Sequence, residues 1–172
     1  DLGLLKQNFD LFGKWAGYLE KYGLIPSEQL CTDDFAGHSE KNANLAVKAI
    51  IGIDCFSHIS KVLGESALAE KFHACAKQYA RQWLSLYSGE KCTVLSMGQV
   101  GSFSLKYNMA IDVLLGGGLF GEDIIKKELE YYEKITNRYG APLDSRETYT
   151  KTDWVMWCAA MGDVNLCDTY AK

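Results

Sequence analysis

Apolar positions along the chain recur with the 3.6-residue period of an α-helix, and only a few connecting segments interrupt this pattern. The two prolines, Pro26 and Pro142, both fall in those connecting segments. Long proline-free stretches with helical periodicity predict an all-α protein. The expected helices cover residues 2–22, 42–63, 65–87, 103–115, 122–139 and 153–161.

These helices alternate between two hydrophobic patterns. The first, third and fifth carry one apolar stripe opposite polar residues, which is typical of a helix with one buried face. The second, fourth and sixth are apolar on nearly all sides, so we expect them in the interior. On the fifth helix, the side chains expected to face water are Lys126, Lys127, Glu128, Glu130 and Lys134.

The connections alternate as well. Long ones, residues 24–41, 88–102 and 140–152, precede the apolar helices, and short glycine turns follow the second and fourth helices. In an up-and-down chain, the three long loops then lie at one end, above the N-termini of the interior helices. The pattern predicts three repeated helical hairpins of roughly 57 residues each.

This layout matches that of α/α toroids, in which inner helices surround an axis and site residues lie on one set of loops. A complete toroid has about six hairpins, so this chain would supply part of one, with the second, fourth and sixth helices inside. Either the three hairpins pack as a compact bundle, or a homo-oligomer or an upstream domain completes the ring and the site. The chain starts at Asp1 without a methionine, so we expect a single domain, residues 1–172, cut from a longer polypeptide.

Composition excludes several classes. Hydrophobic residues make up 48% and charged residues 23%, as in a globular protein. The formal net charge of -4 argues against nucleic acid as a partner, because phosphate binding needs clustered Lys and Arg. No apolar run is long enough to span a bilayer.

The six cysteines show no C-x-x-C spacing, which argues against a zinc site or a redox motif. Three fall within apolar helical patterns and are expected as buried free thiols: Cys55, Cys75 and Cys158. A Cys31–Cys167 or a Cys92–Cys158 disulfide stays open for an exported protein. His58 and His73 lie on helices whose expected geometry keeps them apart from each other and from His38. We therefore predict no metal and no cofactor.

The first two long loops contain candidate site residues. Adjacent carboxylates in a partly closed site can supply an acid and a base, and a serine near a lysine can act as a nucleophile. The first loop and the helix that follows it offer Asp33, Asp34, His38, Asn42, Asn44 and Lys48; the second offers Ser102, Ser104, Lys106, Tyr107 and Asn108. Taken alone, the first set favours helix capping with solvated charges, and capping also explains the serines better than nucleophilic chemistry does.

The third loop is the most concentrated, with candidates Asp144, Arg146, Tyr149, Lys151, Asp153 and Trp154. An arginine can bind a carboxylate in bidentate fashion, and a lysine above a helix N-terminus adds to a site that already favours anions. The alternative is a cap whose charges pair with one another.

Three motifs resemble the helical domain of the fungal and bacterial glutaminase A family. They are T-D-D-F-A-G-H at residues 32–38, S-F-S-L-K-Y-N at 102–108, and Y-G-A-P-L-D-S-R-E-T-Y-T-K-T-D-W at 139–154. The resemblance implies a six-hairpin glycosidase-like toroid that hydrolyses the side-chain amide of L-glutamine to glutamate and ammonia. It also implies a secreted or surface location, with β-rich regions upstream and further helices.

The leading hypothesis is a glutaminase-like amidohydrolase with Asp33, Asp34 and Asp144 as catalytic candidates. Arg146 and Lys151 would bind the substrate carboxylate, and Asp34 or Asp144 would activate water. The substrate-binding candidates are His38, Asn42, Asn44, Lys48, Ser102, Ser104, Tyr107, Asn108, Arg146, Tyr149, Lys151, Asp153 and Trp154.

Under this hypothesis the expected partner is a small-molecule substrate, an amino acid. Two alternative functions stay open, and in the first of them the small molecule is a sugar. In a glycoside hydrolase, two of the loop aspartates would form the acid and base pair, with Trp154 or Tyr149 as a platform for the sugar. In a non-catalytic helical repeat, the same surface would bind a peptide or a protein.

Overall fold

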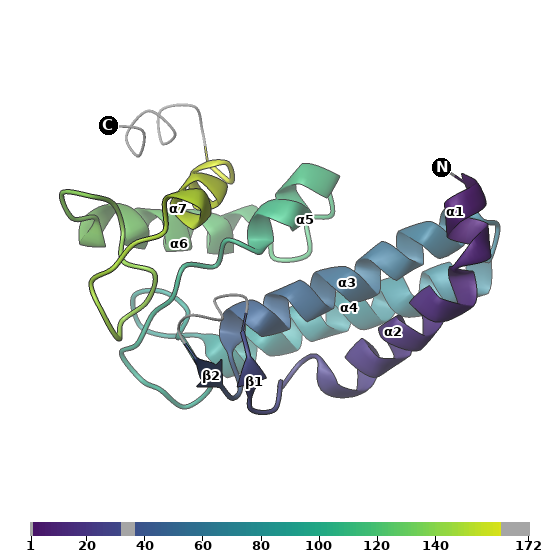
Figure 1. Cartoon of the computed structure of the whole chain (residues 1–172), viewed down its shortest axis with the longest axis horizontal. Helices are drawn as coiled ribbons and strands as arrows, with labels where there is room; N and C mark the ends of the chain where they lie inside the picture. The colour runs from purple at the N-terminus through teal and green to yellow at the C-terminus, as the bar shows by residue number, and fades with distance from the viewer. Residues whose placement is uncertain (1, 32–36, 163–172) are drawn as a thin grey trace.

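The computed structural model of the chain describes residues 2–31 and 37–162 (Figure 1). Helices account for most of this part, and the prediction of an all-α fold is confirmed. The helices are α1 (Leu2–Gln7), α2 (Phe9–Tyr22), α3 (Ala43–Val62), α4 (Ser66–Tyr87), α5 (Met109–Leu115), α6 (Glu122–Ile135) and α7 (Thr152–Ala159). A two-residue antiparallel pair, β1 (Gln29–Leu30) and β2 (His38–Ser39), lies in the first long loop.

The helices α3 and α4 form a long antiparallel hairpin, with α2 packed along α3 (Figure 1). The Asn42 side chain caps α3 by accepting a hydrogen bond from the Leu45 N–H at 2.9 Å. The hairpin turns at Gly64, whose φ of 86° belongs to the left-handed region that favours glycine. Twelve of the twenty α3 residues are buried, as expected for an interior helix.

The second half of the molecule has shorter helices than the sequence predicts. The helix expected at residues 103–115 begins only at Met109, because the preceding segment pairs with the third loop. The Leu105 N–H donates to the Leu143 carbonyl at 2.8 Å, and the Ser145 N–H donates to the Phe103 carbonyl at 3.0 Å. The helix expected to reach residue 139 ends at Ile135.

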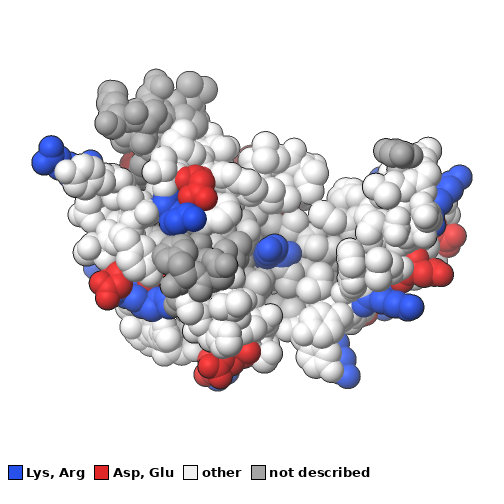
Figure 2. All heavy atoms as spheres, viewed as in Figure 1, with Lys and Arg blue, Asp and Glu red and all other residues white. Residues whose placement is uncertain are grey.

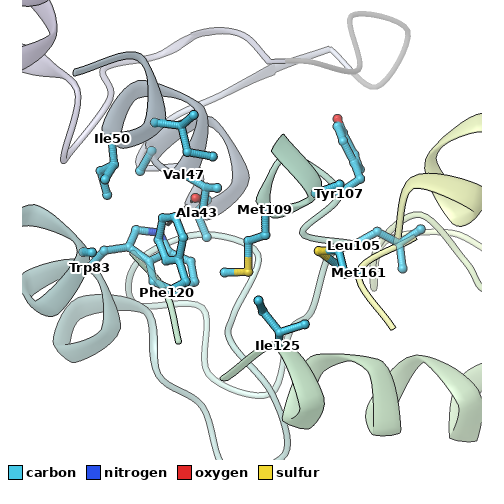
Figure 3. Packing of buried hydrophobic residues seen from close by; sticks show 14 of the residues in the cluster. Ala43, Val47, Ile50, Trp83, Leu105, Tyr107, Met109, Phe120, Ile125 and Met161 are labelled. Carbon is cyan, nitrogen blue, oxygen red and sulfur yellow. Dashed lines mark hydrogen bonds between the residues drawn. The ribbon is translucent and has the colours of Figure 1, made fainter. Parts of the chain in front are cut away.

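Aromatic packing joins the two halves in one core. Trp83 of α4 is fully buried, contacts Phe120 edge to face at 5.3 Å, and donates from Nε1 to the Ala43 carbonyl at 2.9 Å. Figure 3 shows Met109 lying between this aromatic pair and Ile125 of α6. The start of α3, the start of α5 and the connection before α6 are therefore fixed by one cluster.

Two burial predictions are wrong. Glu128, expected to face water, is completely buried because its carboxylate accepts hydrogen bonds inside the fold. Val113, Leu114 and Leu115, expected in the interior, are exposed, because α5 packs on α3 and α7 along one side only. Across residues 2–31 and 37–162, no helix has the length and hydropathy needed to cross a membrane.

Candidate functional site

The three long connections gather at one end of the molecule, where α3, α5 and α7 begin (Figure 1). Backbone pairing holds them together. Asn42 and Ser96 form an antiparallel bridge between the first and second connections. Ser104 and Asp144 form another between the second and third. We call this layer, residues 24–31, 37–42, 88–108 and 136–151, the loop end.

Two buried asparagines link the N-termini of α3 and α5. The Asn108 side-chain amide donates to the Asn44 carbonyl at 3.0 Å, and the Asn108 N–H donates to the Asn44 Oδ1 at 3.4 Å. Both residues are candidates from the sequence, and they lie 64 positions apart in the chain. An amide pair of this kind presents donors and acceptors of fixed geometry to any ligand beside it.

The two charged candidates Asp144 and Arg146 bind each other. One carboxylate oxygen accepts from the Arg146 N–H and Nε at 2.9 Å each, and the other accepts from Nη2 at 2.6 Å. Asp144 is 3% exposed. Hydrogen bonding to Asp144 raises the pKa of Arg146, with burial acting against it. The pair therefore fits the alternative in which the charges of the third loop pair with one another, and not an arginine left open to bind a substrate carboxylate.

Aromatic stacking joins the second loop to α7. Tyr107 lies against Trp154 with ring centroids 4.2 Å apart and planes 9° apart, and Trp157 meets Trp154 edge to face at 5.6 Å. Lys151 lies over the Trp154 ring at 5.8 Å, and its Nζ is 3.6 Å from an Asp153 oxygen. Four candidates from the sequence thus form one cluster with Trp157.

Two hollows flank these contacts. A narrow polar cleft has a volume of about 20 Å³, and among its lining residues are Asn42, Asn44, Ser104, Tyr107, Asp144 and Arg146. A larger apolar groove has a volume of about 600 Å³, and its lining includes Tyr18, Tyr22, Lys48, Asn108, Trp154 and Trp157. Figure 2 shows a largely uncharged, hollowed face between the two halves, with a basic side chain near its middle.

A buried lysine stabilises the loop end through hydrogen bonds to two of its segments. Lys106 is completely buried, and its Nζ donates to the Ser104 carbonyl at 2.9 Å, the Ser104 Oγ at 3.0 Å and the Thr93 carbonyl at 3.4 Å. Burial lowers the pKa of Lys106, while Glu128 acts in the opposite direction. Three acceptors satisfy an ammonium group, so Ser104 acts as an acceptor here and not as an activated nucleophile.

A buried carboxylate whose charge acts on this lysine lies on α6. Glu128 accepts from the Thr93 N–H at 2.7 Å and from the Tyr132 hydroxyl at 2.6 Å. The Tyr132 oxygen in turn accepts from the Lys106 N–H at 2.8 Å. Burial raises the pKa of Tyr132 well above its usual value. Sequence reasoning missed this network, although one signal was present: Glu128 falls within the apolar stripe of its helix.

The remaining candidates have other surroundings or fall outside the described residues. The Ser102 hydroxyl donates to the Gln99 carbonyl at 2.6 Å and accepts from the Leu95 N–H at 3.0 Å, so it shapes its own loop. His38 is exposed on β2, and Tyr149 is 38% exposed. Asp33 and Asp34 fall in residues 32–36, outside the described part.

Two histidines expected to stay apart both contact the carboxylate of Asp54. His73 Nδ1 lies 2.7 Å from one Asp54 oxygen, and His58 Nε2 lies 3.2 Å from the other, on the α3–α4 hairpin. In the described ranges, no group of three or more metal-ligating side chains is arranged to hold an ion.

The structure also decides part of the cysteine question. Cys55, Cys75, Cys92 and Cys158 are free thiols, so the Cys92–Cys158 disulfide is absent. Burial raises the pKa of Cys92 to about 11 and raises that of Cys158 as well. The Cys31–Cys167 alternative involves a residue outside the described part.

Helical hairpins whose connecting loops gather at one end define a helical-hairpin domain of the α/α type. Comparison of the sequence with known families gives a more specific result. The chain belongs to the glutaminase A six helical-hairpin domain family, whose family model matches residues 1–169.

Two curated fungal proteins are similar over nearly the whole chain. One is "Glutaminase A" of Aspergillus oryzae, 33% identical over 174 residues, which cover 99% of this chain and 25% of that protein. Another is "Probable glutaminase/05536" of Arthroderma benhamiae, 29% identical over 201 residues, with 98% and 23% covered. The chain thus spans about a quarter of the length of these relatives. No solved structure gives a significant match.

Proposed function

We propose that the chain is the helical domain of a glutaminase-like hydrolase, acting on the side-chain amide of L-glutamine. The observation that supports it best is the convergence of three separate candidate segments on the N-termini of α3, α5 and α7. The names of the two fungal relatives point to the same reaction. A capping role for each loop alone leaves this convergence unexplained.

The contacts change which residue we assign to the substrate carboxylate. Arg146 is already bound to Asp144, so this pair orders the third loop. Lys48 is exposed, lines the apolar groove beside Asn108, and forms no ion pair or side-chain hydrogen bond with the described residues. We assign the carboxylate to Lys48, with Lys151 adding positive charge next to Trp154. The Asn44–Asn108 pair would orient the amide.

A carboxylate would take a proton from water as the water attacks the amide carbon, and ammonia would leave with a proton returned to its nitrogen. Asp144 already accepts three hydrogen bonds from Arg146, which makes it a positioning residue in this scheme. Asp33 and Asp34, the other sequence candidates, are therefore our choice for the base.

The test is ammonia release from L-glutamine by the purified protein. We expect Asp34→Ala or Asp33→Ala to lower the rate by about 100-fold or more, as removal of a general base does. Asp144→Ala would also lower it, because the loop loses its internal ion pair. The exposed Glu130 supplies the matched control, since Glu130→Ala should leave the rate unchanged. Equal rates in all four variants, or release of sugar from glycosides instead, would rule the proposal out.

A further inference from the structure

The apolar groove is much larger than free glutamine needs. Its volume is about 600 Å³, within the range of roughly 300–1,000 Å³ that is typical of sites for drug-sized ligands. Free glutamine has only about ten non-hydrogen atoms, most of them beside a polar or charged group. The groove therefore has room for a further group on the substrate.

The walls of the groove identify the chemistry of that group. Tyr18 and Tyr22 come from α2 and are 58% and 48% exposed, and Trp157 comes from α7 and is 39% exposed. Large aromatic side chains left open to water on facing helices favour an apolar or aromatic ligand between them.

The charge in the groove indicates that the ligand also carries an anionic group. Lys48 is the one charged residue among the described residues that line the groove, and no carboxylate lines it with Lys48. A cation with apolar surroundings and no partner among the described residues favours an anion, and a carboxylate fits an amino-acid derivative. Lys48 is one helical turn beyond Asn44 on α3, and Asn108 lines the same groove.

We propose that this groove binds glutamine whose α-amino group carries an apolar or aromatic substituent, as in an N-acylated glutamine or a peptide ending in glutamine. Lys48 binds the α-carboxylate, the side-chain amide lies toward the Asn44–Asn108 pair, and the substituent lies over Tyr18, Tyr22 and Trp157. This assignment rests on the proposed function and names the substrate class of the same site.

Binding is tested apart from activity with N-benzyloxycarbonyl-norvaline, which keeps the carboxylate and the aromatic group but has no side-chain amide to hydrolyse. Calorimetric titration should show it binding at least about tenfold more tightly than free norvaline. Lys48→Met should weaken that binding by about tenfold through loss of a charge-assisted contact. Tyr18→Ala and Trp157→Ala should weaken it too, whereas Lys61→Met, at an exposed lysine of the same helix, should not.

Several results would overturn the assignment. They are the absence of binding, equal affinity for norvaline and its benzyloxycarbonyl derivative, equal affinity for the uncharged α-carboxamide of that derivative, or full binding by the Lys48 and aromatic variants. Ammonia release separates the two proposals. Equal kcat/KM for glutamine and N-benzyloxycarbonyl-glutamine would contradict the proposal that the groove binds the substituent, but it would leave the glutaminase proposal unaffected. Specific binding with no ammonia release from either compound would contradict the glutaminase proposal and support the proposal that the groove binds N-substituted ligands.

Discussion

The α2–α4 region and the loop end are stabilised by different interactions. In α3 and α4, apolar side chains form most of the buried surface, and the helices satisfy their own backbone groups. At the loop end, many buried groups are polar. Asn42, Ser104, Lys106 and Asn108 are each at most 6% exposed. The first region depends on hydrophobic burial, and the second depends on polar groups that must find specific partners.

This difference predicts how each region responds to substitution. A hydrophobic core loses stability in proportion to the volume removed from it. A buried polar network loses stability when one partner remains without the other, and loses less when both are removed together. Substitutions in each region can therefore test whether the two regions are stabilised in these different ways.

The largest effect is expected at Trp83, which joins the two regions. Trp83→Ala removes a fully buried ring and its hydrogen bond to the Ala43 carbonyl, so the free energy of unfolding should fall by about 3–5 kcal/mol. Urea unfolding followed by circular dichroism measures this loss. Trp15 is 56% exposed, and Trp15→Ala should change the unfolding free energy by at most about 0.5 kcal/mol. Similar losses in the two variants would contradict the packing described above.

The next effect is expected in the buried network. Lys106→Met removes a buried cation whose charge acts on Glu128, and it leaves the Ser104 and Thr93 carbonyls without their donor. The unfolding free energy should therefore fall by about 3 kcal/mol. Adding Glu128→Leu to that variant should cost less than the sum of the two single changes. Urea midpoints of the four proteins in this cycle measure the coupling. Strict additivity would show that the two charges do not interact, and Lys126→Met provides an exposed control on α6.

The smallest effect is expected at a surface ion pair of the helical region. Lys71 Nζ lies 3.0 Å from a Glu20 oxygen, but the Lys71 side chain is 54% exposed. Lys71→Met should therefore lower the unfolding free energy by at most about 0.5 kcal/mol, less still in high salt. A loss comparable to that of Lys106→Met would mean that ion pairs stabilise both regions equally.

The sequence predicted the helical region well because periodicity carries its information. The helices expected at residues 42–63 and 65–87 are observed at Ala43–Val62 and Ser66–Tyr87. Asn42 has the expected type for a cap, and Gly64 has the expected type for the turn. Both boundaries depend on short-range chemistry that a single sequence shows.

The loop end was predicted in composition but not in geometry. The motifs indicated the right segments, and the structure brings Asn44, Asn108, Tyr107 and Trp154 together. The pairing of Asp144 with Arg146 and the burial of Lys106 depend on contacts between distant segments. Periodicity contains no information on contacts between distant segments, so it predicts neither the pairing nor the burial.

The link between Asn44 and Asn108 also bears on the order in which the protein folds. Within the α3–α4 hairpin, contacts such as that between Asp54 and His73 span 19 positions, whereas the asparagine link spans 64. Closing a longer loop costs more chain entropy and slows the formation of the contact that closes it. We therefore expect the hairpin to form early and the candidate site to assemble late. Amide protons at the loop end should then exchange with solvent before those of α3, so the site opens before that helix.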